Sequence, residues 1–124
     1  MNTIADAKSF TKAVKKLSRK FRNIESDVKD FKSLLRITHE LPQSKWLFTT
    51  KNKATAIKFR QNCSDIQDGK SGGYRIIGLI LAPDEDDKKI VLLTVYIKKA
   101  QDTISKAEID KLIKELASDL EFSE

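Results

Sequence analysis

The feature of the sequence that most constrains the fold is an uninterrupted apolar segment, residues 90–97, which reads IVLLTVYI. Its many β-branched residues favour an extended strand. An apolar run without alternation is typical of a strand that is covered on both faces. We therefore expect a central strand here.

Other segments show weaker strand patterns. Residues 74–81 form a second apolar run, and the acidic turn at 83–87 connects it to the central strand, so the two strands should pair antiparallel. Residues 54–60 alternate apolar and basic side chains, and residues 3–6 are a weak candidate for a short strand.

Periodicity lapses between residues 41 and 53, which contain Pro42 and a polar stretch. We expect a loop here, with Trp46 and Phe48 anchored in the core.

Helical periodicity marks three segments. Asn23 should cap the second helix, and Ser105 with Glu108 forms a capping box before the third. The first helix has an apolar stripe of Phe10, Ala13, Val14, Leu17 and Phe21. The predicted order is β-α-α-β-β-β-α, an α+β fold with an antiparallel sheet packed against an N-terminal helical hairpin and a C-terminal helix, in a single domain spanning 1–124.

The net charge of +6 is unevenly distributed. Residues 8–22 contain seven basic side chains and no acidic one, and residues 45–75 contain seven basic side chains against two acidic ones. Two basic segments in one small domain favour a polyanionic partner, either nucleic acid or an acidic protein.

The chain has one cysteine, Cys63, and one histidine, His39. A single cysteine excludes an internal disulfide and any cysteine-based zinc cluster, so a metal site would have to use carboxylates alone. We expect no metal and no cofactor. There is no apolar run of 18 residues and no signal-peptide pattern, so we expect a cytoplasmic protein with no membrane partner.

Residues 69–71, Gly-Lys-Ser, match the end of a P-loop. The glycine required five residues earlier is replaced by Ser64, and an apolar strand follows instead of a helix. The glycines are better explained as a tight turn into a strand that presents Arg75.

Three stretches carry a resemblance to a known family: KSFTKAVKKL at 8–17, IKFR at 57–60 leading through GKSGGYRII at 69–77, and LLTVYIKK at 92–99. They resemble the RelE/ParE superfamily of bacterial toxins from type II toxin–antitoxin systems, most closely the HigB-like branch of RelE toxins. The resemblance implies a metal-independent endoribonuclease (mRNA interferase) that cuts messenger RNA on the ribosome and inhibits translation. It also implies contact with 16S ribosomal RNA and a cognate antitoxin that covers the basic site.

The resemblance also implies candidate catalytic residues. Arg75 matches the family's transition-state arginine, Lys58 and Arg60 match its basic pair, and Lys98 or Lys99 matches the basic residue after the last strand. Cleavage by a ribose 2′-OH needs a base, cations around the phosphate and an acid for the leaving oxygen. Clustered positive charge can lower the pKa of a lysine enough for that lysine to act as the base or the acid.

RelE itself has a C-terminal tyrosine in its active site, where this chain has Ile104 or Ser105. Three alternatives follow: Tyr96 takes the role of that tyrosine, a lysine acts as the base, or the chain is a weak or inactive nuclease.

Four further residues are candidates for RNA binding. Lys12 and Lys16 on the first helix would contact RNA backbone, Lys70 would reach phosphate or solvent, and Tyr74 either stacks on a base or packs in the core. Two other functions stay open on the same fold: a ParE-like DNA gyrase inhibitor, and a catalytically weak member that binds antitoxin or RNA.

Overall fold

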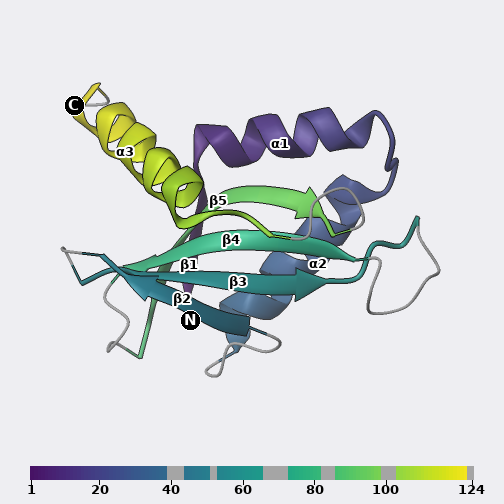
Figure 1. The fold of residues 1–124 in the computed structure, drawn as a ribbon. Coiled ribbons are helices and arrows are strands. Elements are labelled where there is room, and N and C mark those ends of the chain that lie inside the picture. Colours follow the sequence, from purple (N-terminus) through teal and green to yellow (C-terminus); the bar gives the residue numbers. More distant parts are fainter. Residues whose placement is uncertain (39–43, 51–52, 66–72, 82–85, 99–102, 123–124) are drawn as a thin grey trace.

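A five-stranded sheet with helices on both faces forms the body of the protein (Figure 1). The computed structural model describes residues 1–38, 44–50, 53–65, 73–81, 86–98 and 103–122. The elements are β1 (Thr3–Asp6), α1 (Lys8–Ser18), α2 (Ile24–Ile37), β2 (Ser44–Thr49), β3 (Thr55–Gln61), β4 (Tyr74–Leu81), β5 (Lys89–Ile97) and α3 (Lys106–Phe122). The predicted α+β class is confirmed.

The strands lie in the order β1-β5-β4-β3-β2. The pairs β5–β4, β4–β3 and β3–β2 are antiparallel, as predicted for β4 and β5, but β1 runs parallel to β5. The sheet is therefore mixed, and the prediction of an antiparallel sheet is wrong. A four-residue strand that pairs with a strand at the far end of the sequence carries no local signal of its direction.

The central strands β4 and β5 separate two apolar cores, because successive side chains of a strand point to opposite faces. On β4, Ile76 and Ile80 pack with α1 and α2, whereas Ile77 and Leu79 pack with α3. Figure 1 shows α2 behind the sheet and α3 in front of it. The apolar segment 90–97 lies within β5, which is an interior strand of the sheet, as predicted.

The segment predicted as a loop contains the additional strand β2, which pairs antiparallel with β3. Its register shifts between Trp46 and Phe48. Phe48 is partly buried in the core beside α3, and Lys106 Nζ lies 5.2 Å from its ring centroid. Trp46 is 64% exposed, so its predicted anchoring role is wrong. The observed order is thus β-α-α-β-β-β-β-α.

Of the two predicted helix caps, one is present and the other is not. Ser105 Oγ accepts a hydrogen bond from Glu108 N at 3.1 Å, which confirms the cap of α3. Asn23 precedes α2 as predicted, but its side chain forms no cap hydrogen bond and donates instead to Asp65. None of the three described helices combines the length and apolarity that crossing a membrane requires.

Two neighbouring leucines of α2 offer a matched test of the core. Leu35 is 1% exposed and Leu34 is 50% exposed. We predict that Leu35→Ala lowers the free energy of unfolding by about 2–5 kcal/mol, because it leaves a cavity, whereas Leu34→Ala changes it by less than about 0.5 kcal/mol. Urea unfolding of both variants measures the difference. Equal losses would contradict the packing of α2 described above.

Candidate functional site

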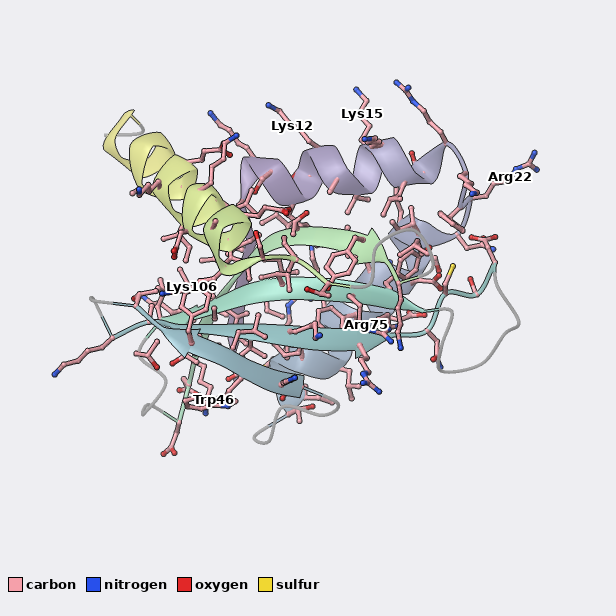
Figure 2. The ribbon with its side chains drawn as sticks, viewed as in Figure 1. Lys12, Lys15, Arg22, Trp46, Arg75 and Lys106 are labelled. Carbon is pink, nitrogen blue, oxygen red and sulfur yellow. The ribbon has the colours of Figure 1, made fainter. Side chains whose placement is uncertain are left out.

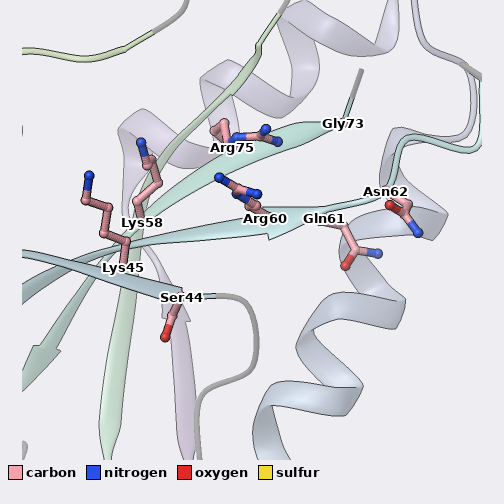
Figure 3. A pocket seen from close by; sticks show the side chains of 8 residues that line it. All are labelled: Ser44, Lys45, Lys58, Arg60, Gln61, Asn62, Gly73 and Arg75. Atoms are coloured by element: carbon pink, nitrogen blue, oxygen red, sulfur yellow. The ribbon is translucent and has the colours of Figure 1, made fainter. Parts of the chain in front are cut away.

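The register of the sheet places basic side chains from three strands beside one another. Arg60 of β3 is opposite Arg75 of β4, and Lys58 of β3 is opposite Lys45 of β2. Residues directly opposite in neighbouring strands share a face of the sheet. Figure 3 shows these four side chains on the same side, with the guanidinium groups of Arg60 and Arg75 next to each other. The predicted grouping of Lys58, Arg60 and Arg75 is therefore present.

These side chains line a cavity of about 280 Å³. Its lining residues are Ser44, Lys45, Lys58, Arg60, Gln61, Asn62, Gly73 and Arg75. Gly73 allows β4 to start close to β3, because a Cβ at this position would lie 2.5 Å from the carbonyl oxygen of Gln61. The glycine before the tyrosine-arginine pair thus has a steric role at the cavity wall.

Sequence reasoning missed Lys45, Gln61 and Asn62 as site residues. Lys45 was missed because its strand was predicted to be a loop. Strand pairing of residues 44–49 with β3 is the signal that would have placed Lys45 beside Lys58. The two amide side chains follow directly after Arg60 and carry no sequence signal of their own.

The surroundings of Lys58 lower the pKa of its side chain. Burial lowers the pKa of its ammonium group below the ordinary value of 10.5, and the positive charges of Lys45, Arg75, Arg60 and Lys98 lower it further. A larger fraction of Lys58 is therefore neutral near physiological pH than for an isolated lysine. Neutral lysine can accept a proton.

Arg75 and Tyr96 lie opposite each other on β4 and β5. Arg75 is 3% exposed, and its Nη1 donates to the carbonyl oxygen of Tyr74 at 3.2 Å. Burial lowers the pKa of Arg75, and Arg60 adds to this effect. The Tyr96 hydroxyl is buried without a hydrogen-bond partner among the described residues, and burial raises its pKa while Arg75 opposes the rise.

Four of the basic side chains at the site have no acidic partner in the described part of the chain. No described carboxylate forms an ion pair with Lys45, Lys58, Arg60 or Lys98. Mutual repulsion between like charges at this density raises the free energy of the site, and a bound anion would relieve it. The arrangement therefore suits a ligand with concentrated negative charge, such as a phosphodiester.

The remaining predicted catalytic residues are at the end of β5. Lys98 follows this strand, and its backbone N–H donates to the carbonyl oxygen of Gly73 at 3.3 Å. Its charge contributes to the lowered pKa of Lys58, so it belongs to the same electrostatic cluster. Lys99 lies outside the described residues, as do Lys70 and His39.

The structure does not bring the other predicted RNA-binding residues to the cavity. Tyr74 is fully buried in the core beside α1 and α2, on the opposite face of the sheet from Arg75. Base stacking by Tyr74 is therefore wrong, and its packing alternative holds. Lys12 and Lys16 are exposed on α1, where they line a groove with α3. In Figure 2, Lys12, Lys15 and Arg22 point away from the sheet and from Arg75.

Comparisons of the chain with models of known protein families, with curated proteins and with solved structures give no significant match. The resemblance to RelE toxins stays a prediction from the sequence motifs.

The electrostatic coupling inside the cavity can be measured directly. We predict that Lys45→Gln raises the pKa of Lys58, because it removes the positive charge that, after burial, lowers this pKa most. Side-chain NMR titration of the lysine amines measures this pKa. Lys114→Gln, on the exposed surface of α3, is the matched control and should leave it unchanged. A Lys58 pKa at or above 10.5 in the native protein would contradict the description of the site.

Proposed function

We propose that the protein is a metal-independent endoribonuclease toxin of the RelE type, which cleaves messenger RNA on the ribosome. The observation that carries the proposal is the convergence of Lys58, Arg60 and Arg75 in one cavity. These are the residues that the motif resemblance assigns to the active site.

The two arginines suit the role of gripping the scissile phosphate. A guanidinium presents paired N–H donors that match two phosphate oxygens. Arg60 is exposed and Arg75 is buried, but their guanidinium groups lie next to each other at the cavity, so both would contact one bound phosphate. Both cations would stabilise the extra negative charge that develops when the ribose 2′-OH attacks phosphorus.

Lys58 is the best candidate for the general base. Its lowered pKa increases the fraction of neutral amine that can accept the proton of the 2′-OH. Lys98 or Tyr96 would then protonate the leaving 5′-oxygen. Tyr96 lies beside Arg75, but its hydroxyl is buried, so this role would require the region between β5 and α3 to open.

A second candidate function is RNA or antitoxin binding without cleavage. It is favoured by the composition of the cavity, because none of the described residues that line it is a histidine or a carboxylate. Catalysis would thus depend entirely on a lysine as base. In either case an acidic segment of an antitoxin could cover the cavity by charge complementarity.

We predict that Arg75→Ala abolishes cleavage in cells. Removing one preorganised cation from a phosphoryl transition state costs on the order of 100-fold or more in rate. Transcript ends are mapped after induction of the wild type, of Arg75→Ala and of Lys114→Ala as a surface control. The wild type and the control should produce new ends inside coding regions, and Arg75→Ala should not.

The same experiment separates the alternatives. Growth arrest without new transcript ends, together with inhibition of purified gyrase in a supercoiling assay, would replace the nuclease proposal by a ParE-like one. Unaltered growth and RNA binding without cleavage would identify the binding function.

The exposed basic face of α1 should contribute to RNA affinity without affecting chemistry. We predict that the double variant Lys12→Ala/Lys15→Ala weakens binding to ribosomes and reduces its salt dependence, because two phosphate contacts with their released counterions are lost. Cosedimentation at several salt concentrations measures both effects. The positions of transcript cleavage should stay the same, since both lysines point away from the cavity.

A further inference from the structure

A second cluster of polar groups lies on the opposite side of the sheet from the cationic cavity. Asp27 is buried in the first turn of α2, and Cys63 and Asp65 follow the end of β3. The Cys63 sulfur and one carboxylate oxygen from each aspartate all lie within 4.8 Å of one another. Two carboxylates and a thiol thus meet at the edge of the core.

Hydrogen bonds fix the orientation of both carboxylates. Asp27 Oδ2 accepts from the backbone N–H and the hydroxyl of Ser64, at 3.0 and 3.1 Å. Asp65 accepts from the backbone N–H and the side-chain amide of Asn23, at 2.9 and 3.0 Å. No described lysine or arginine forms an ion pair with either aspartate. Two neighbouring negative charges are therefore held in place without a described cation.

The hydroxyl of Tyr74 supplies an independent indication of a ligand. Tyr74 is 0% exposed, and its Oη has no hydrogen-bond partner among the described residues. Burial raises the pKa of this hydroxyl, and the neighbouring Cys63 thiol and the Asp27 and Asp65 carboxylates raise it further, so the hydroxyl lies at the same cluster. A buried hydroxyl without a partner carries a substantial desolvation cost, which a bound ligand or its water would remove.

We propose that Asp27, Cys63 and Asp65 form a binding site for one divalent transition-metal ion of the zinc type. Thiolate sulfur and carboxylate oxygen are both ligands that Zn²⁺ accepts, and three protein ligands leave a position for water or the Tyr74 hydroxyl. The hydrogen bonds from Ser64 and Asn23 orient the ligands, as outer partners do in known metal sites. Exposed Asp65 leaves a path for the ion to enter.

The sequence alone argued against such a site, because one cysteine and one histidine left only carboxylates. Folding combines a single thiol with two carboxylates from separate segments. None of the three proposed ligands lines the cationic cavity, so the test of metal binding does not depend on the proposed nuclease activity. The two sites meet at Gln61, which lines the cavity and whose Nε2 donates to the carbonyl oxygen of Asp27 at 3.3 Å. A bound metal ion would link the first turn of α2 to residues 63–65, which follow Gln61 and Asn62.

The full-length chain, freed of metal with a chelator, provides the test. Co²⁺ is the spectroscopic probe and Zn²⁺ is the competitor. We expect saturable binding of one Co²⁺ per chain with a thiolate-to-cobalt charge-transfer band, which Zn²⁺ abolishes. Because the chain has one cysteine, this band reports Cys63 alone. Zn²⁺ should also raise the thermal unfolding temperature.

Three variants make the result specific. Cys63→Ser should eliminate the band, and Asp65→Asn should weaken Zn²⁺ binding by at least about tenfold. Asp30→Asn, on the exposed face of the same helix α2, should leave binding unchanged. Asp65 is exposed, so its variant remains informative if Cys63→Ser does not fold. Absence of the band in the wild type, or equal Zn²⁺ affinity in Asp65→Asn and Asp30→Asn, would overturn the proposal.

Discussion

The pairing of β3 with β4 is the constraint on which both the core and the candidate site depend. This register buries Ile57 and Phe59 while it places Lys58 and Arg60 beside β4 and Arg75. A shift by one residue would exchange the faces of every side chain on β3 and drive two cations into the core under α2. The free energy of burying apolar side chains therefore holds like charges together, although they repel one another.

Apolar burial on both faces of the sheet therefore opposes the repulsion between the basic side chains of the cavity. Lys58, Arg60 and Arg75 are on the interior strands β3 and β4, and the apolar cores on the two faces of the sheet keep these strands from separating. Lys45 is on the edge strand β2. Burial and this repulsion together lower the pKa of Lys58. A bound phosphate would add negative charge to this cluster of cations, so the arrangement suits an anion better than a neutral ligand.

Much of the fold could be predicted because periodicity and apolar runs directly report burial. The spans of β1 and β4 and the cap of α3 follow from such local patterns. The direction of β1 and the existence of β2 could not be predicted, since both depend on pairing with distant segments.

The part of the candidate site that could be predicted is which side chains of one strand share a face of the sheet, because side chains alternate between the two faces. Lys58 and Arg60 share a face because they are two residues apart, and the structure agrees. Tyr74 and Arg75 are adjacent in one strand, so only one of them can reach the cavity, and this restriction was available from the sequence. The cluster at Cys63 could not be predicted, because Asp27 is on α2 and Asp65 follows β3, and only folding brings these segments together.

The parallel pairing of β1 with β5 has a consequence for how the chain reaches this structure. The first strand finds its partner only among residues 89–92, and the side chain of Asn2 accepts from the backbone N–H of Lys88. During synthesis the N-terminal segment must therefore wait, unpaired, until nearly the whole chain has left the ribosome. Such non-local closure is slow relative to helix formation. The nascent protein would expose one edge of its future sheet for most of its translation.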